Sequence, residues 1–147
     1  MTGWIDSCRG AVYPWQCDHI GHMNVMYYVG RFDEGTWNLF TAAGITSAWM
    51  RDNQRGMAAI SQKIAYRREL HPGDVIAIRS GILEVKDKAL RILHEMKNGA
   101  TGEIAAVCEL VGVHLDTTTR RATPLPAEIA ERCRSMIVTY DTTGLWT

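Results

Sequence analysis

Strand patterns dominate the chain after residue 57. Runs rich in β-branched and apolar residues, some of them alternating with polar ones, end at turn residues such as Pro72-Gly73-Asp74 and Asn98-Gly99. In residues 89–97 the alternation is clearest, since it puts Leu90, Ile92, His94 and Met96 on one face. An earlier short strand contains Pro14, which favours a sheet edge or a bulge. The predicted strands are 8–16, 58–70, 75–85, 89–97 and 103–116.

Residues 25–43 have the 3.6-residue period of a helix. Asn24 is the expected N-cap, and Gly44 suits the left-handed position after the last turn. Asp33 falls on the apolar face, so we expect a hydrogen-bonded structural carboxylate or a functional one. Gly30 and Gly35 predict close packing against another element. The predicted apolar face comprises Val25, Val29, Phe32, Thr36, Leu39, Phe40 and Ala43, flanked by Met26 and Trp37.

The remaining segments complete an α+β pattern. Residues 45–56 are predicted as a loop with a short helix, and a second helix begins at Pro126 with Ile129, Met136 and Ile137 facing inward. The order is strand, long helix, four strands running as antiparallel neighbours, and short helix. A long helix with a large apolar face needs a sheet to bury it. We therefore expect one α+β domain over residues 1–147.

Composition narrows the function classes. Hydrophobic residues make up 46% of the chain and the formal net charge is zero, which gives no electrostatic case for binding nucleic acid or a membrane surface. The apolar runs are too short to span a bilayer, and residues 1–6 do not resemble a signal peptide, so we expect a cytoplasmic protein. The four cysteines are irregularly spaced, which indicates neither a zinc site nor a redox pair.

Reactive polar groups are concentrated in residues 18–24, between the first strand and the long helix. Asp18 could activate water or attack a carbonyl, and the helix N-terminus offers N–H donors for a negative oxygen. The structural alternatives are an Asx-turn at Asp18 and the helix cap at Asn24. His22 is either an acid–base group or a donor that shapes the turn. Cys17 ranks below Asp18 as a nucleophile because free cysteines are usually small buried hydrophobes.

The pattern Asp18-x-x-Gly21-His22-x-Asn24, followed by a tyrosine-bearing helix, resembles the start of the hotdog-fold acyl-CoA thioesterases of the 4-hydroxybenzoyl-CoA type. The resemblance continues through 72–74, 113–116 and 124–126 and spans residues 9–135. It implies an antiparallel sheet wrapped around one long central helix. It also implies a homodimer, or a dimer of dimers, with sites between subunits, and hydrolysis of a short-chain acyl-CoA to free acid and CoA.

The resemblance also implies roles for individual residues. By motif position Asp18 is the catalytic nucleophile or general base, assisted by His22 and Asn24. Arginines are candidates for the CoA phosphates, although a solvated surface arginine is the alternative for each. His19 lies outside the motif, and the two histidines are too close in sequence for a metal-ligand set, so we expect no metal and no cofactor beyond the CoA of the substrate. The arginine candidates are Arg67, Arg68, Arg120 and Arg121, with Arg51 and Arg55 in the loop.

Five tryptophans suggest an aromatic substrate wall. Trp15, Tyr28 and Trp37, with the Asp33 carboxylate, could hold a quaternary ammonium group, and burial in the core is the alternative. The chain also resembles the betainyl-CoA thioesterases of bacterial carnitine breakdown, which implies betainyl-CoA as substrate. Two other functions remain open. A hotdog hydratase or dehydratase carries an Asn-Pro motif that this sequence lacks, and a non-catalytic acyl-CoA-binding domain would have no use for Asp18.

Overall fold

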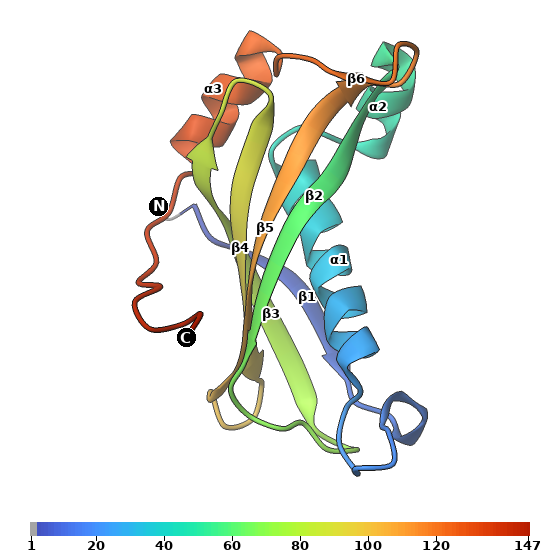
Figure 1. The fold of residues 1–147 in the computed structure, drawn as a ribbon, viewed down its shortest axis with the longest axis vertical. Coiled ribbons are helices and arrows are strands. Elements are labelled where there is room, and N and C mark those ends of the chain that lie inside the picture. The colour runs from blue at the N-terminus through green and yellow to red at the C-terminus, as the bar shows by residue number, and fades with distance from the viewer. Residues whose placement is uncertain (1–2) are drawn as a thin grey trace.

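The structure, a computed structural model, describes residues 3–147. One curled antiparallel sheet wraps around the long helix α1, which confirms the predicted α+β arrangement (Figure 1). The strands are β1 (Ile5–Ala11), β2 (Arg55–Tyr66), β3 (Val75–Val85), β4 (Ala89–Asn98), β5 (Ile104–Asp116) and β6 (Arg121–Ala122). The helices are α1 (Val25–Ala42), α2 (Ser47–Asn53) and α3 (Ala127–Ser135), with a short 3-10 helix η1 (Pro14–Gln16). Among the residues described, no helix has the length and apolarity that crossing a bilayer requires.

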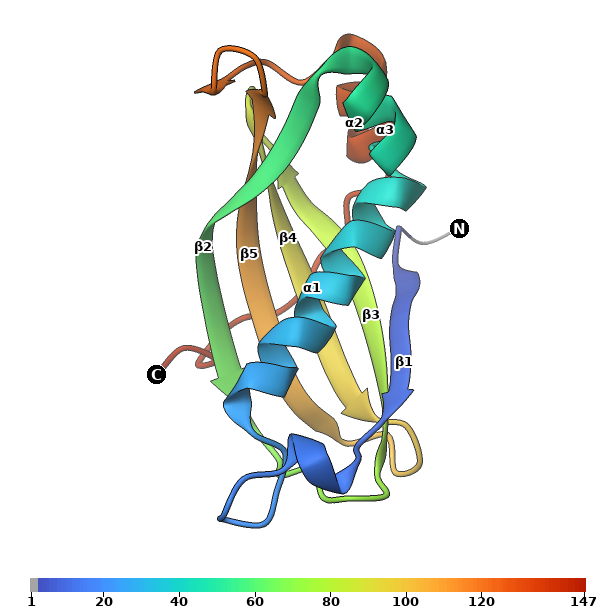
Figure 2. The same cartoon turned by 90° about the vertical axis from the view of Figure 1, so that its right-hand side faces the viewer.

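The strand order in the sheet is β1-β3-β4-β5-β2, with β6 beside the end of β5. The prediction of four successive antiparallel neighbours after the helix holds only for β3, β4 and β5. Strand β2 pairs with β5 instead, and β1 lies beside β3. Sequence pattern identifies strands but not their partners, because every strand offers the same ladder groups. As a result β1 and β2 are the two open edges of the sheet (Figure 2).

The predicted bounds of two strands are wrong. The first strand covers Ile5–Ala11 rather than 8–16, because Pro14 begins η1, where its missing N–H costs nothing. Its edge position agrees with the expectation, but the bulge between Asp6 and Cys8 lies away from Pro14 and outside the predicted strand. Strand β2 begins at Arg55 and ends at Tyr66, four residues before the predicted end.

Helix α1 lies across the concave face of the sheet (Figure 2). Phe32 and Leu39 are fully buried there. The predicted apolar face is partly wrong, because Val25, Met26, Val29 and Trp37 are exposed by 37–66%. Helical periodicity finds an apolar stripe, but it does not say what covers that stripe. Part of the stripe meets the core, and part lies open beside β2.

The two helix glycines differ. A Cβ on Gly35 would lie 2.9 Å from Ser7 Oγ and 3.3 Å from His94 Nδ1, which confirms the expected close packing. Gly30 has nothing within 4 Å, so the same expectation is wrong there. The space beside Gly35 holds a buried hydrogen-bonded chain that joins helix to sheet. It runs from Thr36 Oγ1 to His94 Nε2 (2.8 Å), then through Ser80 to Ser7.

The C-terminal part follows its prediction in outline. Pro126 precedes α3 as its N-cap, and Ile129 is buried. Met136 is partly buried, but Ile137 is 44% exposed, and Val138 is buried in its place. Residues 138–147 then cross the face of the sheet opposite α1 (Figure 1).

Candidate active site

The loop between η1 and α1 is closed by hydrogen bonds of Asp18. Its Oδ1 accepts from the N–H of Ile20 at 2.9 Å, which is the expected Asx-turn. The N–H of Asp18 donates to the carbonyl of His22 (3.1 Å), and Gly21 donates back to the carbonyl of Asp18 (3.0 Å). Gly21 has φ 98°, a left-handed conformation that favours glycine. The motif glycine is therefore explained by the turn.

Asn24 joins this turn to α1. Its side-chain oxygen accepts from the N–H of Met26 at 3.0 Å, which confirms the predicted N-cap. Its amide nitrogen donates to Asp18 Oδ2 at 3.4 Å. One oxygen of Asp18 is thus held by the turn, and the other points to the helix start beside a polarised amide. That is an arrangement in which a carboxylate can meet a carbonyl carbon or a water.

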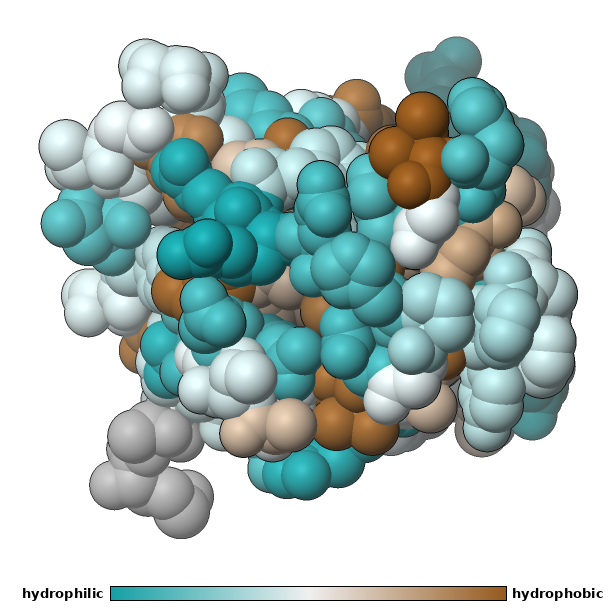
Figure 3. Space-filling model, turned by 90° about the horizontal axis from the view of Figure 1, so that it is seen from below, coloured by the Kyte–Doolittle hydropathy of each residue, from teal (hydrophilic) through white to brown (hydrophobic). Residues whose placement is uncertain are grey.

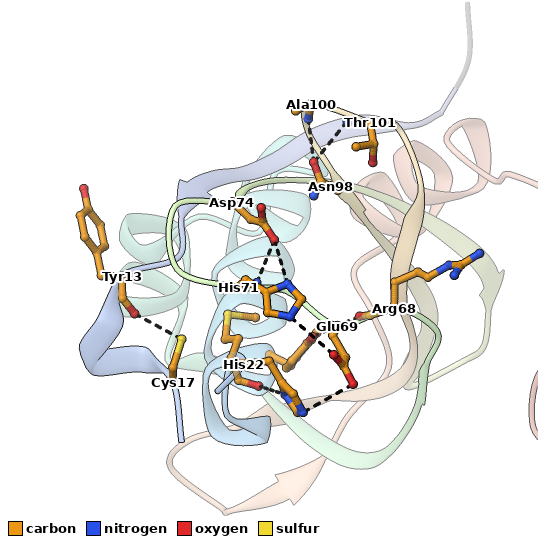
Figure 4. A network of polar contacts seen from close by, with 12 residues as sticks. Tyr13, Cys17, His22, Arg68, Glu69, His71, Asp74, Asn98, Ala100 and Thr101 are labelled. Atoms are coloured by element: carbon orange, nitrogen blue, oxygen red, sulfur yellow. Dashed lines mark hydrogen bonds and ion pairs between the residues drawn. The ribbon is translucent and has the colours of Figure 1, made fainter. Parts of the chain in front are cut away.

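The loop is fastened to the connection between β2 and β3. The N–H of Met23 donates to the carbonyl of Leu70 at 2.7 Å, and Val12 exchanges backbone hydrogen bonds with Gly73 and Asp74. Asp74 Oδ2 also accepts from the N–H of His71 at 2.8 Å. Two of the motifs that carry the resemblance, residues 18–24 and 72–74, therefore lie side by side although they are far apart in sequence (Figure 4).

His22 points toward this connection (Figure 4). Its Nε2 lies 3.8 Å from Glu69 Oε1, and His71 Nε2 lies 3.5 Å from the other oxygen of Glu69. His71 Nδ1 lies 3.8 Å from Asp74. Two imidazoles thus share one carboxylate at the mouth of the site. Among residues 3–147, no three histidine, cysteine or acidic side chains come together in a way that could hold a metal ion.

A pocket of about 230 Å³ opens beside the start of α1, and we call it the Tyr66 pocket. Tyr28 and Tyr66 form its aromatic wall, edge to face at 5.1 Å between ring centres. The hydroxyl of Tyr28 donates to the carbonyl of Arg68 (3.5 Å), and burial raises the pKa of Tyr28 to about 12. Arg67 and Arg68 lie at the rim. The lining residues are His22, Met23, Val25, Tyr28, Tyr66, Arg67, Arg68 and Glu69.

A second pocket, of about 150 Å³, lies further along α1, and we call it the Trp37 pocket. Asp33 and Trp37 line it with Phe40, whose ring meets the indole edge to face at 5.8 Å. Asp33 is exposed and has no hydrogen-bond or ion-pair partner among the described residues. Asp33 is therefore not the hydrogen-bonded structural carboxylate that was one of its two expected roles.

The other candidates lie apart from both pockets. Trp15 is 69% exposed and stacks on Tyr13 at 4.5 Å between ring centres. Arg120 and Arg121 precede and begin β6, at the end of the molecule opposite the Asp18 loop (Figure 1). Arg55 pairs with Asp116 at 3.1 Å. The exposed positions are His19, Arg51, Arg120 and Arg121.

Sequence reasoning missed Tyr66 and Glu69. The alternation along β2 gave a usable signal for Tyr66, because Ile64 and Tyr66 share the face toward α1. Glu69 had no such signal, since its place beside His22 depends on how the loop docks on the β2–β3 connection.

Seen from below, this end of the molecule is mostly hydrophilic, with apolar residues scattered between polar ones (Figure 3).

Comparison with known proteins assigns the chain to a family. The model of the thioesterase-like superfamily matches residues 12–133, so the chain belongs to that superfamily. No curated protein sequence is significantly similar to the chain. The part that the family model covers includes the Asp18 loop, both pockets' residues on α1 and β2, and the start of α3.

Solved structures confirm the hotdog fold. A hypothetical protein from Staphylococcus aureus in complex with CoA superposes with a TM-score of 0.83 at 18% identity, over 91% of this chain and 86% of that one. A probable thioesterase from Escherichia coli gives 0.77 at 20% identity, over 91% and 100%. A Thermus thermophilus thioesterase complexed with CoA and zinc gives 0.77 at 24% identity, over 92% and 96%.

Proposed function

We propose that this chain is an acyl-CoA thioesterase in which Asp18 acts on the thioester carbonyl. The observation that carries the proposal is the Asp18–Asn24 pair at the start of α1, beside a pocket with an aromatic wall and an arginine rim. A thioester has a carbonyl that needs an attacking group, an oxyanion that needs donors and a thiol that must leave. The Asp18 carboxylate, the N–H of Val25 at the start of α1 and the open pocket are the groups we assign to these three requirements, since the N–H groups of Met26 and Tyr27 already donate to Asn24.

The chemistry can follow either of two routes. As a general base, Asp18 takes a proton from water while the oxygen of that water bonds to the carbonyl carbon; the C–S bond then breaks and the thiolate takes up a proton. As a nucleophile, Asp18 bonds to the carbonyl carbon and releases the thiolate, and water then hydrolyses the anhydride. A single turnover in H₂¹⁸O distinguishes the routes, because only the anhydride route can place ¹⁸O in the Asp18 side chain.

We further propose that two copies pair through β2. This edge leaves ladder groups unpaired and carries Ile60, which is 67% exposed. Val25, Val29 and Trp37 of α1 are exposed on the same side. An antiparallel pairing of two β2 strands runs them in opposite directions. It therefore brings the Arg55 and β6 end of one copy, with Arg120 and Arg121, toward the Tyr66 pocket of the other.

The most detailed part of the proposal concerns the chemical nature of the acyl group. Asp33 and Trp37 offer the chemistry of a cation site. Asp33 lies nine positions after Asn24, which is about 13 Å along the helix from its start. Betainyl-CoA has a single methylene between carbonyl and ammonium, which is too short to reach Asp33 from Asp18 of the same copy. A longer cationic acyl group, such as 4-trimethylammoniobutyryl, extends further along this line.

The test is thiol release from a panel of acyl-CoAs. Betainyl-CoA is compared with the neutral 3,3-dimethylbutyryl-CoA, and 4-trimethylammoniobutyryl-CoA with a neutral analogue of the same length. A cation–π contact of about 0.5–2 kcal/mol predicts a roughly 2- to 30-fold preference for the cation. Equal rates within both pairs would refute the proposed cation site. If no acyl-CoA of the panel releases thiol, the proposed thioesterase activity is refuted. Activity should persist in EDTA.

A further inference from the structure

The segment after α3 forms one wall of a groove on the outer face of the sheet, away from α1. Residue 138 is tied to β3, since the N–H of Val138 donates to the carbonyl of Ile82 at 2.8 Å. Tyr140 is tied to β4 by a 2.8 Å hydrogen bond from its hydroxyl to Glu95 Oε2. The segment then reaches β2, where the Trp146 ring lies beneath Lys63 Nζ at 5.9 Å. Figure 1 shows this segment on the side of the sheet opposite α1.

The groove between this segment and β2 has a volume of about 500 Å³, and we call it the Trp146 groove. Ile64 packs against the core, so its neighbours Lys63 and Ala65 point to the outer face. The other lining residues are Ile64, Tyr66, Arg67, Leu145, Trp146 and Thr147, so two of the lining side chains are basic and none is acidic. Glu109 lies opposite Lys63 in the sheet, but Arg91 already binds it at 2.8 Å.

At the end of β2, Tyr66 and Arg67 line both the Trp146 groove on the outer face and the Tyr66 pocket on the face toward α1, so the two meet around the last residues of this strand. From Arg67 to Lys63 the groove follows β2 for about 13 Å, at roughly 3.3 Å per residue. A ligand whose reactive end lies near Asp18 and whose arm fills the Tyr66 pocket would therefore emerge at Arg67. What it meets next is one guanidinium, one ammonium and one indole.

We propose that the Trp146 groove binds the nucleotide end of the CoA thioester, with the adenine on the Trp146 indole and the phosphates at Lys63 and Arg67. This inference rests on the proposed thioesterase function. Nucleobases stack on aromatic side chains, and phosphates pair with flanking cations. Arg67 Nη2 donates to the carbonyl of Leu145 at 3.4 Å, so the same side chain that meets a phosphate also holds the wall of the groove. Tyr140 is a positioning residue, since its bond to Glu95 fixes the start of that wall.

The test compares two substrates that differ only in the nucleotide. For an acyl-CoA, Trp146→Ala should raise KM by about 5- to 160-fold, the range for loss of one base–aromatic stack, with kcat unchanged. For the matching acyl-pantetheine the same variant should leave KM unchanged. Lys63→Ala should raise KM for the acyl-CoA by about 2- to 5-fold. Trp146→Phe should restore most of the affinity. Lys86→Ala, an exposed lysine in the β3–β4 turn, is the matched control.

Tyr140→Phe keeps the ring and removes only the bond to Glu95, so it should raise KM for the acyl-CoA alone. An equal effect of Trp146→Ala on both substrates, or no effect on either, would overturn the groove assignment. If the unaltered protein hydrolyses neither substrate, the thioesterase proposal fails by itself. Calorimetry with CoA then tests the groove assignment separately. Binding of CoA that Trp146→Ala abolishes supports the assignment, and absence of CoA binding refutes it.

Discussion

Replacing Asp18 with asparagine separates its structural role from its chemical one. Asparagine can still accept the 2.9 Å hydrogen bond from Ile20, because its side-chain oxygen occupies the same place as Oδ1. It cannot accept from Asn24 with its amide nitrogen, so the 3.4 Å bond is lost. A long, partly exposed hydrogen bond is worth about 0.5 kcal/mol, the low end of the usual range. For a chain of this size that lowers Tm by about 1–2 °C.

The chemical loss should be far larger. A carboxamide neither takes a proton from water at neutral pH nor attacks a carbonyl. Removing a general base costs roughly 100- to 10,000-fold in turnover, or about 2.7–5.5 kcal/mol of activation free energy. Fold and stability are measured by circular dichroism and thermal melting, and turnover is measured by thiol release. The energetic gap between the two effects is wide enough to be decisive.

The matched control is Asp116→Asn. Asp116 Oδ1 accepts from the N–H groups of Thr118 and Thr119 at 2.8 and 3.1 Å, so it makes the same kind of turn at the end of β5. This variant also weakens the ion pair with Arg55, but it should keep turnover far above that of Asp18→Asn, since no reacting group is removed. If Asp18→Asn keeps more than about a tenth of its turnover, the chemical role given to Asp18 is wrong. If its Tm falls by more than about 6 °C, the turn, not the chemistry, explains any loss.

Three other predictions concern stability and assembly. Gly35→Ala should lower Tm, because the new Cβ would lie 2.9 Å from Ser7 Oγ. Gly30→Ala should raise Tm by about 2–4 °C, because it gains about 1 kcal/mol of helix propensity in open space. Similar Tm shifts for the two variants would contradict the close packing at Gly35. Burial lowers the pKa of His94 to about 3 from its ordinary 6.5. The unfolded chain therefore binds a proton at this residue before the folded protein does, and the folded state loses stability as the pH falls from 6.5 toward 3. The free energy of unfolding should fall by up to about 1.4 kcal/mol per pH unit in this window. Urea unfolding at several pH values should show this slope, and His94→Gln should flatten it. Ile60→Lys should shift the protein to a monomer in analytical ultracentrifugation, and an unshifted dimer would exclude pairing through β2.

The sequence predicts local structure where one segment determines it. The Asn24 cap, the Asp18 turn and the left-handed Gly44, with φ 91°, follow from the chemistry of a few neighbouring atoms. Strand partners do not follow, as β2 shows: it pairs with β5 across 61 positions at Arg55 and Asp116. Which strands meet depends on the whole sheet, and no residue within β2 encodes it.

The site could be predicted only as far as its first motif. Asp18 and Asn24 lie close together in sequence and do meet in space. Val29 and Trp37 show the limit, because an apolar stripe looks the same whether a sheet, a ligand or a second copy covers it. Glu69 shows the same limit of local patterns, since its neighbour His22 comes from a separate part of the chain. Distances between elements are set by tertiary packing, which local patterns do not contain.

The way the Asp18 loop is fastened has a consequence for how the molecule refolds. Strands β3, β4 and β5 follow one another and pair over short loops, which close at small entropic cost. Strand β1 must find β3 across a separation of 75 residues, from Ile5 to Ser80, and such distant pairings form slowly. The loop docks on the β2–β3 connection through Met23 and Leu70, so it is completed only after both sheet edges are in place. During refolding from urea, catalytic activity should therefore return later than the circular dichroism of the sheet.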